Sequence, residues 1–137
     1  MKKAGISFAF SVVFSYLCDV FGPFHDSIII LCTMMVIDYM TGVLQAIYKK
    51  KLNSKIGARG IVKKALIILV TAMACLLDTK YFGGVMAIGN MVIGFYIFNE
   101  GISILENVGK CGVKYPEKLE KILTQLKDKN DSNSQEV

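Results

Sequence analysis

The sequence predicts an all-α integral membrane protein with about four transmembrane helices, or three, and a C-terminal amphipathic helix in the cytoplasm. The chain of 137 residues is 53% hydrophobic with a mean hydropathy of +0.48, and its apolar residues stand in long blocks. A soluble protein of this length would distribute polar residues more evenly to cover its surface. When four spans are drawn through the blocks, all but one of the 16 Lys and Arg residues fall on one side of the membrane.

The basic residues flank the apolar blocks, and only Lys80 falls on the far side. Short loops rich in Lys and Arg stay in the cytoplasm during insertion, so we expect both termini to be cytoplasmic. No nucleic-acid-binding motif accompanies the net charge of +5, which favours contact with the anionic lipid bilayer over nucleic acid, at about 1 kcal/mol per residue. The residues expected at lipid headgroups are Lys49, Lys50, Lys51, Lys55, Arg59 and Lys63.

The first apolar block predicts a helix over residues 5–21, and Gly22-Pro23 ends it with strong turn-forming chemistry. Lys2 and Lys3 before this block resemble the start of a signal peptide. No small-x-small cleavage site follows, so we expect the helix to be retained. The second block predicts a helix over residues 27–48, about 33 Å long, which is enough to cross a hydrocarbon core of about 30 Å.

The third helix is predicted over residues 61–77. Its length of about 26 Å requires Lys63 and Lys64 to extend their amines to the headgroups. Gly83-Gly84 marks the next turn, and the fourth helix is predicted over residues 85–105. Residues 1–109 would therefore form the transmembrane domain.

Residues 110–137 form a second region of different character. Pro116 suits the first turn of a helix, and apolar residues then recur with helical spacing. This pattern predicts an amphipathic helix that lies on the membrane or pairs with a partner helix. Residues 129–137 are polar and are expected to be disordered. The apolar stripe consists of Leu119, Ile122, Leu123 and Leu126.

Polar and small residues lie inside the predicted spans. Asp38 is the most unusual, because a carboxylate at the centre of a transmembrane helix costs about 2.5–3.5 kcal/mol. Such residues either join helices within one bundle, or meet between protomers and line a water-filled lesion, and both interpretations stay open. The candidates for helix–helix assembly or pore lining are Asp38, Thr41, Gly42, Gln45, Ala46, Lys64, Thr71, Asp78, Asn90, Gly94, Glu100 and Ser103.

Nothing in the sequence favours an enzyme. It shows no nucleophile–base pair, no glycine-rich phosphate loop and no cluster with metal-ligand spacing. We therefore expect no catalytic residue, no cofactor and no metal site. The four cysteines lack a paired motif, which makes disulfide and metal interpretations weak. They are Cys18, Cys32, Cys75 and Cys111.

A longer pattern begins at Asp38 and resembles the toxin-secretion/phage-lysis holin family. The resemblance covers about residues 38–123, and several spacings agree at once. Residues 5–21 and the polar tail are similar only in character, and the family is often described with three spans. The pattern consists of Asp38-x-x-x-Gly42, Ala46, Lys51-Leu52-Asn53-Ser54, Gly60-x-x-x-Lys64, Asp78, Asn99-Glu100-Gly101-Ile102-Ser103-Ile104-Leu105-Glu106-Asn107, Cys111-Gly112 and Pro116.

The resemblance implies a multi-pass phage or prophage protein in the cytoplasmic membrane of the bacterial host. Such a holin would oligomerise with itself and form lesions at a timed moment in lysis. An endolysin, or a toxin in some members, would then pass through without needing to bind the holin directly. Two alternatives remain open: a small ion channel subunit, and a membrane anchor that recruits a soluble partner through residues 116–127.

Overall fold

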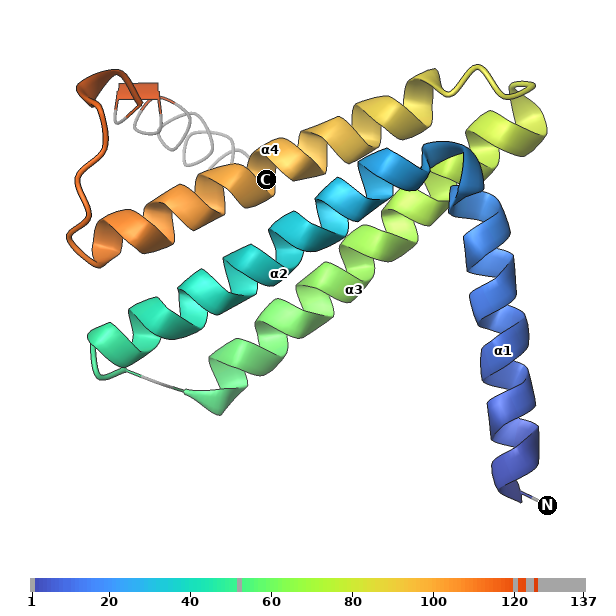
Figure 1. Cartoon of the computed structure of the whole chain (residues 1–137), viewed down its shortest axis with the longest axis horizontal. Coiled ribbons are helices and arrows are strands. Elements are labelled where there is room, and N and C mark those ends of the chain that lie inside the picture. The colour runs from blue at the N-terminus through green and yellow to red at the C-terminus, as the bar shows by residue number, and fades with distance from the viewer. Residues whose placement is uncertain (1, 52, 120, 123–124, 126–137) are drawn as a thin grey trace, which may run out of the picture.

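Every regular element of the computed structural model is helical over the residues that it describes, which are 2–51, 53–119, 121–122 and 125. Four long helices follow one another, with one short helical turn after α1 and another after α3 (Figure 1). The elements are α1 (Lys2–Phe21), the 3₁₀ turn η1 (Gly22–Phe24), α2 (His25–Tyr48), α3 (Ser54–Leu76), the π-helical turn η2 (Leu77–Tyr81) and α4 (Ala87–Lys110).

Helices α2, α3 and α4 lie side by side as a bundle, whereas α1 leaves the bundle at the start of α2 and points away from it (Figure 1). Val20 is buried, Leu17 and Phe21 are half-buried, and the other side chains of residues 5–21 are exposed. The Gly22-Pro23 break was predicted correctly. However, α1 does not lie alongside α2. The bend at η1 leaves α1 pointing away from the bundle (Figure 1).

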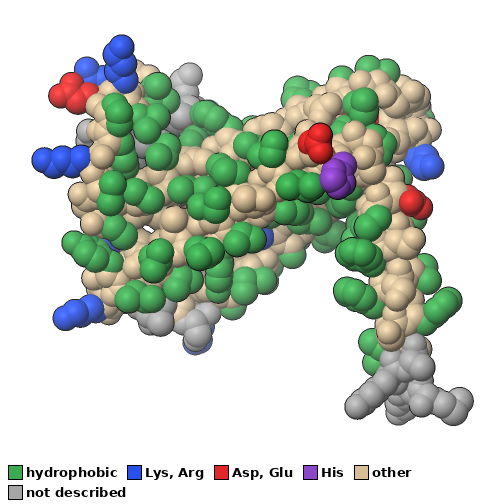
Figure 2. All heavy atoms as spheres, in the orientation of Figure 1, with side chains coloured by type: hydrophobic (Ala, Val, Ile, Leu, Met, Phe, Trp, Pro, Cys, Tyr) green, Lys and Arg blue, Asp and Glu red, His purple; other side chains and the backbone are tan. Residues whose placement is uncertain are grey.

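Three stretches are long and apolar enough to cross a membrane, and α1 and α2 together form the first of them, Gly5–Tyr48. The other two are Gly57–Tyr81 and Ala87–Lys110. The prediction of an all-α membrane protein is therefore confirmed, with three candidate spans. Much of the exterior of the helices carries exposed hydrophobic side chains (Figure 2).

The helix boundaries differ most from the prediction at α3. It begins at Ser54 because the Asn53 side chain caps it, accepting a hydrogen bond of 2.9 Å from the backbone N–H of Lys55. Lys55 and Arg59 therefore lie on the first turns of a helix, not in a loop. At the other end, Gly83 and Gly84 adopt positive φ angles of 69° and 82°, which return the chain toward α4.

The hydrophobic core lies at one end of the bundle, where η1, the end of α3 and the start of α4 meet. We call this end the hydrophobic half. The hydrophobic effect does not drive helices together in lipid, because lipid tails are as apolar as the side chains. Close van der Waals packing of this kind is therefore a main source of helix association there. Its buried apolar residues are Val20, Phe24, Leu31, Met35, Cys75 and Ile93.

The segment after α4 folds back onto that helix. Tyr115 donates a hydrogen bond of 3.0 Å to the backbone oxygen of Leu105. Its hydroxyl would lie 1.7 Å from a Cβ at position 109, so this contact requires Gly109. Residues 117–119, 121, 122 and 125 are helical, in the region of the predicted amphipathic helix. Leu123, Leu126 and the predicted disordered tail lie outside the described residues.

Candidate functional site

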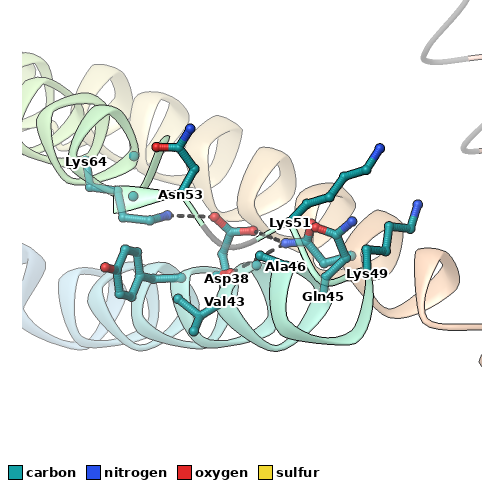
Figure 3. A pocket seen from close by; sticks show the side chains of 13 residues that line it. Asp38, Val43, Gln45, Ala46, Lys49, Lys51, Asn53 and Lys64 are labelled. Carbon is teal, nitrogen blue, oxygen red and sulfur yellow. Dashed lines mark hydrogen bonds and ion pairs between the residues drawn. The ribbon is translucent and has the colours of Figure 1, made fainter. Parts of the chain in front are cut away.

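Three helices contribute one charged side chain each to a largely buried ion cluster, which consists of Asp38, Lys64 and Glu100. The Lys64 amine donates a hydrogen bond of 2.9 Å to Asp38 Oδ2 and another to Glu100 Oε2. The side chains are 17%, 16% and 8% exposed for Lys64, Asp38 and Glu100. One cation from α3 therefore stands between a carboxylate of α2 and a carboxylate of α4, and Figure 3 shows the Asp38–Lys64 side of this arrangement.

Asn107 completes the surroundings of Asp38. Its amide donates to Asp38 Oδ1 at 3.2 Å and to Thr41 Oγ1 at 3.4 Å. The Thr41 hydroxyl in turn donates to the backbone oxygen of Asp38 at 2.9 Å. Both carboxylate oxygens of Asp38 thus accept hydrogen bonds from other helices. Sequence reasoning named Asn107 only as part of the family pattern and not as a candidate for helix–helix assembly. It stands two helical turns after Glu100 and so shares its face.

This cluster supplies the partners that an intramembrane Asp38 needs. Removing one member of a buried ion pair typically costs about 3–5 kcal/mol, because the remaining charge is left unpaired. Charged residues within membrane helices usually face the bundle interior and pair with one another for this reason. The structure brings Asp38, Lys64 and Glu100 together within one chain, so their pairing needs no second protomer.

Asp78 is buried in the hydrophobic half and has a different environment. Its side chain is 1% exposed, and Oδ2 accepts a hydrogen bond of 2.5 Å from the backbone N–H of Gly89. The Phe24 ring covers the same place, and a Cβ at position 89 would lie 2.6 Å from it. Thr71 is also fully buried, and its hydroxyl donates to the backbone oxygen of Ile67 at 2.8 Å.

The other predicted candidates divide between the inside and the outside of the bundle. Gly42, Gln45 and Ala46 are half-buried and line a cavity, and Ser103 is half-buried on α4. In contrast, Asn90 and Gly94 are exposed on the outer face of α4. All six basic residues expected at headgroups are exposed. They are Lys49, Lys50, Lys51, Lys55, Arg59 and Lys63.

A cavity of about 400 Å³ lies between α2 and α3, at the end of the bundle opposite the hydrophobic core. Asp38 and Lys64 belong to its wall, and Lys49 and Lys51 stand where α2 ends (Figure 3). Small residues on both helices keep the space open. They are Gly42, Ala46, Gly57 and Gly60. We call this end of the bundle, with the ion cluster and the cavity, the polar half.

Sequence reasoning also missed a polar stripe on α1, formed by Ser7, Ser11, Ser15 and Asp19. All four residues are exposed. The Ser11 hydroxyl donates a hydrogen bond of 2.9 Å to the backbone oxygen of Ser7, within the same helix. Their regular spacing of four places them along one helix face. That spacing was the available signal.

No group of three or more His, Cys, Asp or Glu side chains that could hold a metal ion occurs among the described residues. The four cysteines are free thiols: Cys18 and Cys32 are exposed, Cys111 is half-buried and Cys75 is buried. The polar chemistry of this site therefore consists of ion pairing and hydrogen bonding between helices.

Comparisons with known proteins identify relatives over most of the chain. An uncharacterized 14.9 kDa protein in the nagH 3′ region of Clostridium perfringens is 44% identical over 110 residues, covering 80% of this chain and 83% of the relative. An uncharacterized protein of Listeria monocytogenes is 38% identical over 121 residues, covering 88% and 83%. A probable holin of Bacillus phage phi105 is 35% identical over 107 residues, covering 77% and 78%.

No solved structure matches the chain. The sequence model of the bacteriophage holin family matches residues 15–128, which include the end of α1, all of α2 to α4 and every member of the ion cluster. The resemblance that begins at Asp38 is thereby confirmed and extended toward the N-terminus. The chain belongs to the bacteriophage holin family.

Proposed function

We propose that this protein is a holin that oligomerises in the bacterial cytoplasmic membrane and opens lesions at a timed moment in host lysis. An endolysin, or an exported toxin, passes through these lesions without having to bind the holin. The observation that carries the proposal is the match to the bacteriophage holin family over residues 15–128, because it includes the whole bundle.

The surface and the interior of one copy suit a harmless stage before lesions form. Hydrophobic side chains cover much of the exterior (Figure 2), and the interior of the hydrophobic half is filled by Leu31, Cys75 and Ile93, each no more than 1% exposed. A bundle of three helices packed in this way offers no passage for a folded enzyme. Release of an endolysin therefore calls for many copies acting together.

Assembly in this proposal uses the polar and small residues that a single copy leaves exposed. Asn90 and Gly94 form one such surface on α4, and the stripe containing Ser11 and Ser15 forms another on α1. In lipid, small and polar side chains favour helix–helix contact because backbones approach closely and hydrogen bonds find partners. The ion cluster would then act on timing, since its pairing determines how easily α2, α3 and α4 separate.

We count α1 and α2 as two separate crossings, which gives four with α3 and α4. This orientation places both termini and the polar half on the cytoplasmic side. Lys50, Lys55, Arg59 and Lys63 are exposed there and would contact anionic headgroups. Cysteines introduced near residues 3 and 130 of a variant without native cysteines test this orientation. Labelling of both positions from the cytoplasmic side alone supports it, and labelling of either position from outside contradicts it.

The functional test is induction of the chain in a bacterium, with and without a co-expressed cytoplasmic endolysin. We expect an abrupt loss of membrane potential in both cultures, and lysis only where the endolysin is present. Cells that keep their potential and survive with the endolysin would refute the proposal. A small, fixed and ion-selective conductance would favour a channel subunit, and loss of all function on removing residues after Lys114 would favour an anchor.

A further inference from the structure

Two hollows between α2 and α3 meet at Tyr39 and Lys64, which line both of them. One is the polar cavity of about 400 Å³ described above. The other is a groove of about 450 Å³ with an almost entirely apolar wall. The two hollows therefore adjoin along α2 and α3, one with charged residues in its wall and the other almost entirely apolar. The remaining residues that line the groove include Cys32, Val36, Met40, Ile61, Ala65 and Ile68.

The polar cavity carries excess positive charge. Its lining includes three lysines, Lys49, Lys51 and Lys64, and one carboxylate, that of Asp38. The exposed side chains of Lys49 and Lys51 extend away from Asp38 (Figure 3). Lys64 is already paired with Asp38 and Glu100, whereas Lys49 and Lys51 take part in no ion pair among the described residues. The amides of Gln45 and Asn53 add hydrogen-bond donors. An anionic, oxygen-rich group matches this lining.

The apolar groove lies deeper in the predicted spans than the cavity does. On α2 the groove involves residues 32–40 and the cavity residues 38–49, so their centres are separated by about 11 Å along the helix. The groove walls on α3, Ile61, Ala65 and Ile68, are equally apolar. A ligand that fills both hollows must have an anionic head and an apolar chain.

We propose that the cavity and the groove together bind one anionic phospholipid, with its phosphate at Lys49 and Lys51 and an acyl chain along Ala65 and Ile68. The inference rests on the proposed membrane placement, with the polar half at headgroup depth. A soluble phosphate compound would use the cavity and leave the groove empty. A second copy of the chain would bring another basic segment against Lys49 and Lys51, which like-charge repulsion disfavours.

The test measures ligand retention by the purified full-length protein in a neutral detergent, using native mass spectrometry. The three probes are phosphatidylglycerol, phosphatidylcholine and glycerol phosphate, which is the same headgroup without acyl chains. We expect phosphatidylglycerol to be retained at least about tenfold more strongly than either of the others, because only it satisfies both hollows. Equal retention of phosphatidylcholine, or equal binding of glycerol phosphate, would overturn the proposal.

Variants separate this site from general attraction to the positively charged surface. The double variant Lys49→Gln/Lys51→Gln removes the cavity charge, and Lys50→Gln/Lys55→Gln removes the same charge from exposed positions outside the cavity. We expect about tenfold weaker retention of phosphatidylglycerol in the first and less than a twofold change in the second. Equal losses in both would show that the lipid binds only through surface charge.

Ala65→Phe tests the groove, because Ala65 is exposed and a larger side chain there fills the apolar space. We expect phosphatidylglycerol retention to fall severalfold while glycerol phosphate binding stays unchanged. Unchanged lipid retention in this variant would overturn the groove's role. If the natural chain forms a dimer that dissociates in the Lys49/Lys51 double variant, the site binds a second copy of the chain and not a lipid. Retention is measured without cells, so its failure is distinguishable from failure of the lysis assay.

Discussion

The two halves of the bundle are held together in different ways. In the hydrophobic half, apolar side chains such as Phe24, Leu31 and Ile93 are almost completely buried. In the polar half, three helices meet at the Lys64 amine beside a cavity of about 400 Å³. Water that enters the bundle changes the contacts between buried apolar side chains little. It weakens an ion pair sharply, because it raises the local dielectric constant. The polar half is therefore where we expect the helices to separate first, with the hydrophobic half as the hinge.

The largest effect is expected from Lys64→Met, which leaves the carboxylates of Asp38 and Glu100 facing each other without a cation. The free energy of unfolding in bicelles should fall by about 3–5 kcal/mol. The matched control is Lys63→Met, since Lys63 is the exposed neighbour of Lys64, and its effect should stay within about 0.5 kcal/mol. Equal effects of the two substitutions would show that the ion cluster does not stabilise the polar half.

A smaller loss is expected from Gly89→Ala, which probes the hydrophobic half. The new methyl group would lie 2.6 Å from the Phe24 ring and 3.2 Å from Asp78 Oδ2. Such overpacking should lower the free energy of unfolding by about 1–3 kcal/mol. The control is Gly94→Ala, where nothing lies within 4 Å of the added methyl group. If Gly94→Ala is as harmful as Gly89→Ala, steric crowding is not the cause.

Asp38→Asn should alter stability less than Lys64→Met but should shift timing. The new amide has one oxygen, which can accept from Lys64 or from Asn107 but no longer from both. Because Lys64 keeps Glu100 as a partner, a loss of about 1 kcal/mol is expected. The onset of membrane depolarisation after induction should move measurably from that of the natural chain. Wild-type timing in both Asp38→Asn and Asp38→Leu would mean that Asp38 has no role in triggering.

Ser15→Leu on α1 should have the smallest effect on the bundle, because this side chain is exposed and makes no contact with the core. The free energy of unfolding of one copy should change by less than about 0.5 kcal/mol. Chemical crosslinking between copies should nevertheless decrease, with Val12→Leu, also exposed on α1, as the control outside the polar stripe. Undiminished crosslinking would exclude this stripe from assembly.

The sequence was informative about helices and their breaks, because these depend on local composition. Gly22-Pro23 ends α1 and Gly83-Gly84 forms the turn before α4, both as predicted, and Asp38 shares a half-buried face with Thr41 and Gly42. The direction of α1 was not predictable, since it depends on packing around Val20 and on the geometry of η1. Hydrophobicity measures whether a segment suits lipid, and it carries no information on the angle between two such segments.

Long-range pairing was the other part that the sequence left open. Lys63 and Lys64 look alike in the chain, and both were expected to reach headgroups. Neighbouring residues on a helix, however, point about 100° apart, so Lys63 is exposed whereas Lys64 reaches Asp38 and Glu100. The cavity was equally unforeseen, because it depends on how far apart α2 and α3 stand.

The single 3₁₀ turn between α1 and α2 has a mechanical consequence. Helix α1, Lys2–Phe21, is a rod of about 30 Å. Among its described side chains only Leu17, Val20 and Phe21 are buried or half-buried. A rotation of about 20° at Gly22–Phe24 would sweep its free tip through roughly 10 Å, by the same length estimate. A neighbouring copy could thus be engaged or released at the far end of this rod while the interior of each bundle stays undisturbed.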